Sequence, residues 1–234
     1  MVECPGVTGK PRGLLEVSHR RLTWAHGTTT PVSDGPCGKF SDPLLTTRRL
    51  CSCSRGSGTM THGSLESLRL SYRPERVRLL LVGESPPDGG MFFYRANSLL
   101  YSATYDAFAR VYEPNWPTGH EFLGFFQSLG CYLDDLCLHP VNDLVWSERM
   151  DARRLAVQCL ADRIRSYAPE AITSVMYEIQ CHVWRAASLA GMERAVAASL
   201  PFPMGRNVHT YRDELEGLLR RLIDQGVLLS NPCG

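Results

Sequence analysis

The stretch that decides the fold is VRLLLVGESPP, residues 77–87. Its first part is a short apolar run, which predicts a buried strand that stops at Gly83. A glycine there permits unusual backbone angles and the close approach of a ligand, and Pro86 and Pro87 stiffen the chain that follows. In an open parallel sheet, ligands bind beyond the carboxyl ends of the strands, so this turn is the first candidate for a functional site.

Strand-like and helix-like segments alternate along the chain from Ser64 onward. Further strands are expected at residues 132–138, 171–175 and 195–200, and helices at 99–111, 120–129, 152–161, 178–190 and 207–224. We expect Gly130 to end the second helix and Asp151 to cap the third. This alternation favours an α/β fold, a three-layer α/β/α sandwich with a mostly parallel four-stranded central sheet.

The first 60 residues differ in composition from the rest. They are rich in Gly, Pro, Ser and Thr without a sustained period, which predicts a disordered tail before an α/β domain at residues 61–234. The tail holds eight Lys and Arg against four Asp and Glu, so it carries a net charge of +4 and leaves −3 for the domain. Its cysteines lack the spacing of a zinc ribbon, and no metal site is expected: Cys4, Cys37, Cys51 and Cys53.

The remaining composition bears on the location of the protein. No stretch approaches the eighteen or so unbroken apolar residues of a membrane span, and the N-terminus lacks the pattern of a signal peptide. We therefore expect an intracellular monomer without a membrane partner, in the cytoplasm or in a eukaryotic nucleus. Four cysteines lie among helix or strand residues, as reduced core thiols often do, and no disulfide framework is expected: Cys131, Cys137, Cys159 and Cys181.

Aromatic residues follow the first turn closely. Glu84 and Ser85 in the turn precede the run Phe92, Phe93 and Tyr94. A carboxylate beside aromatic rings suits a pocket that stacks on a planar ring while an acid or base acts at the ring edge. The alternative is a strand-ending turn whose aromatic residues pack in the core.

Two further loops follow predicted strands. Residues 200–207, LPFPMGRN, form a rigid proline loop that leads into a helix, where backbone N–H groups and Arg206 could bind a phosphate. The alternative is an ordinary connection with Asn207 as the helix cap. The other loop is LHPVND, residues 138–143. If the sheet is parallel, all three loops emerge at one edge.

The order of these parts resembles the uracil-DNA glycosylase superfamily over residues 75–224. Residues 83–87 look like the first motif of that family and are closest to the Gly-Glu-Ala-Pro-Gly form of its iron–sulfur branch. The resemblance implies a DNA repair enzyme that flips a base out of DNA and hydrolyses its N-glycosidic bond. Glu84 would orient or deprotonate water, and Ser85 stands where several branches of the family place Asp or Asn.

The same resemblance implies residues that contact the base and the DNA. Phe92 or Phe93 would stack on the base, Tyr94 belongs to the same aromatic run, and Asp135 falls near the position of the base-reading Asn. The residues that would contact DNA lie in the late loop and at the start of the following helix: Pro201, Phe202, Pro203, Arg206 and Asn207.

The chain also departs from the family pattern. Leu200 stands at the position of the late-loop histidine, and hydrocarbon cannot stabilise negative charge on a departing base. An ionised Asp135 would only accept hydrogen bonds and would repel a carbonyl edge, which argues against uracil as the target base. The Cys-x-x-Cys pair of the iron–sulfur branch is absent, so neither an iron–sulfur cluster nor another cofactor is expected.

Two other functions stay open. A non-catalytic member of the same fold would bind nucleic acid or a nucleotide without cutting it, although a domain charge of −3 is unusual for strong duplex binding. Residues 82–85 also look like the Gly-Asp-Ser block of SGNH esterases, with Ser85 as the nucleophile. The late Asp-x-x-His block of those enzymes is absent, however, and Pro86 removes an N–H that an oxyanion would need.

Overall fold

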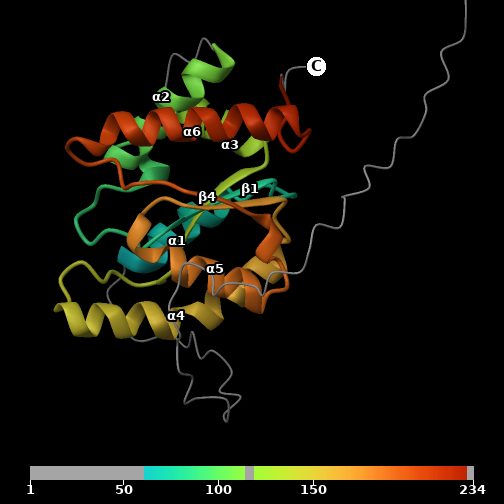
Figure 1. Ribbon diagram of the computed structural model, residues 1–234. Helices are drawn as coiled ribbons and strands as arrows, with labels where there is room; N and C mark the ends of the chain where they lie inside the picture. The colour runs from blue at the N-terminus through green and yellow to red at the C-terminus, as the bar shows by residue number, and fades with distance from the viewer. Residues whose placement is uncertain (1–60, 114–118, 231–234) are drawn as a thin grey trace, which may run out of the picture. The chain divides into compact units, whose positions relative to one another are not determined.

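The computed structural model describes residues 61–113 and 119–230, which are shown as coloured ribbon in Figure 1. Within these residues the strands are β1 Leu79–Gly83, β2 Cys131–Asp135, β3 Ala171–Ser174 and β4 Val196–Ser199. The α-helices are α1 Thr61–Ser71, α2 Leu99–Tyr112, α3 Gly119–Ser128, α4 Trp146–Tyr167, α5 Gln180–Leu189 and α6 Asn207–Asp224. Three 3-10 helices are η1 Phe93–Arg95, η2 Tyr177–Ile179 and η3 Glu193–Ala195. The predictions made for residues 1–60 lie outside the described residues.

The strands form one sheet in the order β2-β1-β3-β4, and every pairing in it is parallel. Helices α2, α3 and α6 lie on one side of the sheet, and α1, α4 and α5 lie on the other (Figure 1). The predicted three-layer α/β/α sandwich is therefore confirmed. Because β1 is a central strand covered on both faces, its apolar residues 79–82 are fully buried.

Most boundaries agree with the sequence predictions to within one or two residues, and α6 spans the predicted 207–224. The prediction of Asp151 as a helix cap is wrong, because α4 begins at Trp146 after Val145, which makes no side-chain cap hydrogen bond. Asn207 is the first residue of α6 rather than its cap, and the capping position is taken by Arg206. No helix in the described part of the chain is long and apolar enough to cross a membrane.

Strand β2 ends three residues earlier than predicted. It stops at Asp135 because its neighbour β1 ends at Gly83 and turns away. Beyond the strands, the segments that follow β1 and β2 stay hydrogen-bonded for two more residues. The N–H groups of Leu136 and Cys137 donate to the carbonyls of Gly83 and Glu84, each at 2.8 Å. This continuation holds the turn after β1 beside the end of β2.

The outer edge of β2 is paired by a side chain. The hydroxyl of Tyr94 donates to the carbonyl of Leu133 at 2.9 Å and accepts from the N–H of Leu133 at 2.8 Å. An edge strand otherwise presents unpaired backbone groups, and here a buried phenol satisfies them. The Tyr94 ring stacks on Tyr72, with ring centroids 5.3 Å apart. The structure thus gives Tyr94 a role in the core.

The cysteines only partly follow the expectation of reduced thiols. Cys131 and Cys137 are free and buried, as expected. Cys159 on α4 and Cys181 on α5 are disulfide-bonded, so the expectation is wrong for these two residues. Both are half-buried on helices that pack against each other, and sequence spacing does not reveal such tertiary proximity.

Gly130 is the glycine on which the connection from α3 to β2 depends. Its φ is +78°, and its carbonyl accepts from the N–H groups of Arg78 and Leu79. A Cβ added to Gly130 would lie 2.8 Å from Cγ of Arg78 and 2.9 Å from the carbonyl oxygen of Arg76. Both the backbone conformation and the available space therefore require glycine.

We predict that Gly130→Ala lowers the free energy of unfolding by at least about 1–2 kcal/mol, the cost of a left-handed conformation alone. Gly124→Ala in α3 is the matched control, because nothing lies within 4 Å of its added Cβ. Since alanine favours a helix, this control should gain about 0.5–1 kcal/mol. Urea unfolding followed by circular dichroism measures both changes, and equal effects would contradict the prediction.

Candidate functional site

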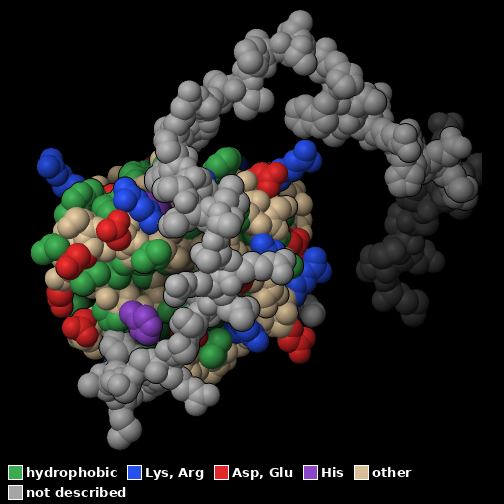
Figure 2. Space-filling model, turned by 90° about the horizontal axis from the view of Figure 1, so that it is seen from below, with side chains coloured by type: hydrophobic (Ala, Val, Ile, Leu, Met, Phe, Trp, Pro, Cys, Tyr) green, Lys and Arg blue, Asp and Glu red, His purple; other side chains and the backbone are tan. Residues whose placement is uncertain are grey.

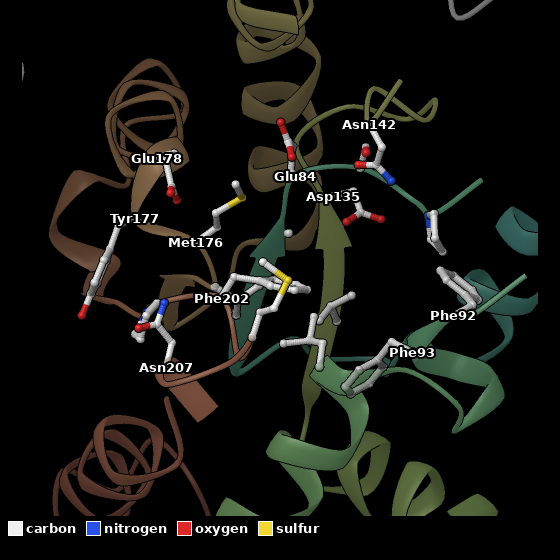
Figure 3. Close-up of a pocket in the computed structure, with 18 of the residues that line it drawn as sticks. Glu84, Phe92, Phe93, Asp135, Asn142, Met176, Tyr177, Glu178, Phe202 and Asn207 are labelled. Carbon is white, nitrogen blue, oxygen red and sulfur yellow. The ribbon is translucent and has the colours of Figure 1, made fainter. Parts of the chain in front are cut away.

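A cavity of about 440 Å³ opens at the carboxyl edge of the sheet. Its walls come from the segments that follow all four strands, as Figure 3 shows from within the pocket. The three predicted loops do meet at one edge. They contribute the following residues to the lining: Gly83, Glu84, Ser85, Pro87, Asn142, Pro201, Phe202, Met204 and Asn207. The segment after β3, residues 175–178, was not predicted to take part and completes the wall.

The cavity brings together most of the predicted site residues. Those in its lining are Glu84, Ser85, Phe92, Phe93, Asp135, Pro201, Phe202 and Asn207. Three others are not part of the lining: Tyr94, Pro203 and Arg206. Pro203 is buried beneath the late loop and Arg206 is exposed beside it, so both lie next to the cavity in sequence without forming its wall.

Glu84 is held by two arginines from α4. Its Oε1 accepts from Nε of Arg149 at 2.6 Å and from Nε of Arg153 at 2.7 Å, and its Oε2 accepts from Nη2 of Arg149. Burial acts to raise the pKa of Glu84, but the hydrogen bonds from Arg149 and Arg153 outweigh it, and the pKa lies below its ordinary value. Figure 3 shows the carboxylate turned toward α4. Glu84 is therefore a poor proton acceptor.

Asp135 occupies the floor of the cavity beside Gly83. The two residues are register partners across β1 and β2, and a Cβ on Gly83 would lie 2.5 Å from Oδ1 of Asp135. Only glycine leaves room for this carboxylate. In Figure 3 the Asp135 side chain points toward the centre of the pocket, unlike that of Glu84. Of the two acids, Asp135 is thus the one that faces a ligand.

Asp134, the preceding residue, takes most of the hydrogen-bond donors near this floor. Its Oδ1 accepts from Nη1 of Arg69 at 2.5 Å and from the backbone N–H of Asp135 at 2.7 Å. Its Oδ2 accepts from the hydroxyl of Tyr167 at 3.1 Å, and Arg163 lies 3.4 Å from Oδ1. Successive side chains of a strand point to opposite faces, so one acid is buried in ion pairs and the next faces the cavity.

The Asp135 carboxyl group is buried with few hydrogen bonds or ion pairs that would offset its loss of hydration. Its Oδ2 lies 3.5 Å from Nη1 of Arg69, at the limit of a hydrogen bond, and its exposed fraction is 4 %. Burial raises the pKa of Asp135 to about 7, and the neighbouring charge of Asp134 also raises it, against the attraction of Arg69 and Arg163. A carboxyl group in such a site is partly protonated at neutral pH.

Aromatic residues form the apolar walls. Phe92 and Phe93 are almost fully buried, and Phe93 packs edge-on against Tyr101 with ring centroids 5.8 Å apart. Phe202 stands across the cavity on the late loop and is more exposed (Figure 3). The cavity therefore combines one inward-facing acid with fixed aromatic walls, which is an arrangement suited to a planar polar ring.

Several residues of the site carry no prediction from the sequence. Arg149 and Arg153 are four residues apart on α4, a spacing that places both on one helix face, and this signal could have been used. Arg69 was missed together with α1, which the sequence analysis did not predict as a helix. Tyr177 and Glu178 follow β3 at the same edge and could have been inferred from a parallel sheet.

A serine-nucleophile site is not assembled. Oγ of Ser85 accepts a hydrogen bond from the N–H of Val141 at 3.3 Å, and no histidine is among the residues that line the cavity. His182 is buried on α5, and neither ring nitrogen has a hydrogen-bond partner in the part of the chain that the structure describes. Burial lowers the pKa of His182, and the positive charge of Arg153 lowers it further.

Leu200 likewise offers no polar group to the cavity. It is buried, and its N–H extends the sheet by donating to the carbonyl of Ser174 at 2.8 Å. Within residues 61–113 and 119–230 there is no group of three or more His, Cys, Asp or Glu side chains that could hold a metal ion. The carboxyl, guanidinium and amide side chains that line the cavity are Glu84, Asp135, Glu178, Arg149, Asn142 and Asn207.

Comparison with known proteins gives no functional information about these residues. No protein-family model matches the chain, and no curated protein matches it in sequence. A functional interpretation therefore rests on the geometry of the cavity.

We predict that Arg153→Met lowers the free energy of unfolding by roughly 2–3 kcal/mol, because it leaves the buried Glu84 with one of its two cationic partners. Arg154→Met is the matched control, since Arg154 is exposed and its one ion pair within the described residues is with Asp151 at 3.2 Å. The control should change stability by less than about 0.5 kcal/mol. Denaturant unfolding at pH 7 compares them, and a loss of similar size in both would refute the role assigned to Arg153.

Proposed function

We propose that the cavity binds a nucleobase extruded from DNA and that the chain hydrolyses the N-glycosidic bond of that nucleotide. The observation that carries this proposal is the convergence of Asp135, Glu84 and the aromatic walls on one cavity of about 440 Å³. Pockets of this size hold small planar ligands, and extrusion is how enzymes reach a base. The resemblance to uracil-DNA glycosylases in the order of the loops supports the same conclusion.

The two acids take different roles in this proposal. Oε1 of Glu84 is occupied by both arginines, whereas Oε2 accepts only from Arg149 and keeps room for another donor. A water molecule bound to Oε2 would be oriented for attack on the sugar rather than deprotonated, because Glu84 is a weak base. Asp135 would bind the edge of the base while Phe92 or Phe93 contacts its ring.

The late loop would contact the strand around the extruded nucleotide. Pro201 is buried and fixes the loop, while Phe202 and Met204 present apolar side chains at its surface. Exposed apolar side chains of this kind can fill the gap that an extruded base leaves. Arg206 and the first backbone N–H groups of α6 lie beside them, where they could hold a backbone phosphate.

The surface charge favours substrates that need little electrostatic attraction. Residues 61–234 carry a net charge of −3, and the described side chains visible in Figure 2 intersperse basic and acidic groups. Strong duplex binding depends on neutralising many phosphates. Single strands and mismatched sites, where extrusion of a base is least costly, are therefore the substrates of choice.

The absence of lysine from the domain bears on whether the DNA strand is cleaved after the base is removed. Residues 61–234 contain no lysine. A lysine of this domain therefore cannot form the Schiff base that leads from base removal to strand cleavage. We expect a protein without residues 1–60, and so without Lys10 and Lys39, to leave an abasic strand that stays intact until alkaline treatment.

A second candidate function is binding of nucleic acid without cleavage. It is favoured by the pairing of Glu84 with Arg149 and Arg153, which neutralises the charge that would stabilise a cationic sugar. The buried Leu200 at the late-loop position favours it as well. Binding without release of a base would decide for this candidate.

The test is base release from single-stranded and mismatched oligonucleotides, each carrying one uracil, hypoxanthine or alkylated base. With the full chain, we expect Asp135→Ala and Glu84→Gln each to lower the rate at least about 100-fold. Glu148→Gln is the control, because Glu148 is exposed and does not line the cavity. Melting temperatures confirm that the variants fold. Unchanged rates in both site variants, or no release from any substrate by the wild type, would overturn the proposal.

A further inference from the structure

We infer that Asp135 binds the base as a neutral carboxylic acid, and that the cavity therefore selects uncharged bases whose edge places an N–H beside an acceptor. A neutral acid offers one O–H donor and one acceptor oxygen, whereas a carboxylate only accepts. The inference rests on the proposed function in one respect, namely that the cavity holds a base. It adds the class of base and the residue that selects it.

The two adjacent acids divide the nearby hydrogen-bond donors unequally. Asp134 accepts from Arg69, Tyr167 and its own neighbouring backbone N–H. Arg163 directs its Nη2 to the carbonyl oxygens of Asp135 and Leu136 at 2.6 and 3.3 Å, away from the Asp135 side chain. Among residues 61–113 and 119–230, the Asp135 side chain keeps only the 3.5 Å approach of Arg69. A buried carboxylate with so little compensation favours its neutral form.

The charged groups that surround Asp135 also disfavour its ionised form. Helix α1 contributes Arg69 and Glu66, α4 contributes Arg163, and β2 contributes Asp134. Two guanidinium groups therefore face three carboxyl groups, so the cluster carries excess negative charge if all three ionise. The free thiol of Cys137 lies near the same end of β2 and is also buried. The pKa of Asp135, raised to about 7 by burial, agrees with this arrangement.

The position of the proton follows from the same contacts. Oδ2 faces Nη1 of Arg69 and acts as an acceptor there, so the proton resides on Oδ1, next to Gly83. From this position the O–H can donate to a carbonyl oxygen of the base while Oδ2 accepts from the neighbouring N–H. An ionised Asp135 would instead repel a carbonyl edge and attract a cationic, alkylated base. The expectation against uracil depended on an ionised Asp135 and does not hold for the neutral acid.

The protonation of Asp135 determines whether the affinity for a base rises or falls with pH. Below pH 7 the acid is neutral and its donor is present, and above pH 7 the donor is lost. Affinity for an uncharged base should therefore be constant at low pH and fall about tenfold per pH unit well above 7. Asp135→Asn keeps a donor and an acceptor at every pH, so its affinity should not change with pH.

The experiment uses the full chain with free uracil as the probe, because uracil is not cleaved. Titration calorimetry between pH 5.5 and 8.5 should give a wild-type dissociation constant about 30-fold higher at pH 8.5 than at pH 6. The constant of Asp135→Asn should vary less than about twofold over this range and match the wild type at pH 6. Uracil should also bind more tightly at pH 6 than the cationic nucleoside 1-methyladenosine.

A measurement without ligand tests the protonation state alone. In ¹³C-labelled wild-type protein, the side-chain carboxyl resonance of Asp135, assigned with the Asp135→Asn variant, should titrate near pH 7. A midpoint below pH 5, a pH-independent uracil affinity in the wild type, or tighter binding of 1-methyladenosine would overturn the inference. If the carboxyl titrates near 7 but neither protein binds uracil at any pH, the base-binding function fails, and base selection by Asp135 fails with it.

Discussion

The pairing of Gly83 with Asp135 across β1 and β2 is the constraint on which the site depends. The parallel register sets the two residues side by side at the carboxyl edge of the sheet, and the space that a Cβ would need is occupied by Oδ1 of Asp135. A shift of one residue along β2 would turn Asp135 away from the cavity, because strand side chains alternate in direction. The glycine that ends the apolar run thus serves to accommodate an acid from the neighbouring strand.

Three acids at this edge end in three environments, and the difference comes from the helices that reach them. Two arginines on α4 hold Glu84 as a carboxylate. Arg69 on α1 and Arg163 on α4 hold Asp134. Asp135 faces the aromatic walls, and its side chain approaches Arg69 only at 3.5 Å among the described residues. Burial without pairing favours the neutral acid and burial with pairing favours the ion, so helix placement assigns the chemistry of each carboxyl group.

The layers of the fold could be predicted from the sequence, because apolar runs such as residues 79–82 and the periodic helix at 207–224 are local signals. The convergence of the loops followed from the expectation of a parallel sheet. The contacts of Glu84 are not predicted, because the helix expected at residues 152–161 excludes Arg149; only a helix that begins earlier lets the four-residue spacing of Arg149 and Arg153 place both on one face. The protonation of Asp135 could not be predicted either, because it depends on which of two adjacent acids receives Arg69, a tertiary contact with no local signature.

Leu200 and Asp135, the two departures from the pattern of the resembling glycosylase family, both concern how negative charge on a departing base would be stabilised. A base that leaves a sugar gains negative charge, and the family supplies a histidine from the late loop to stabilise it. Here Leu200 is committed to the sheet through its N–H and presents only hydrocarbon. On the proposed function, the O–H of a neutral Asp135 is a donor already directed at the base from the opposite strand, and its hydrogen bond strengthens as charge develops on the accepting oxygen. On the proposed function, an acid where the resembling family has an amide would thus supply from the floor of the cavity the hydrogen-bond donor that Leu200 does not offer.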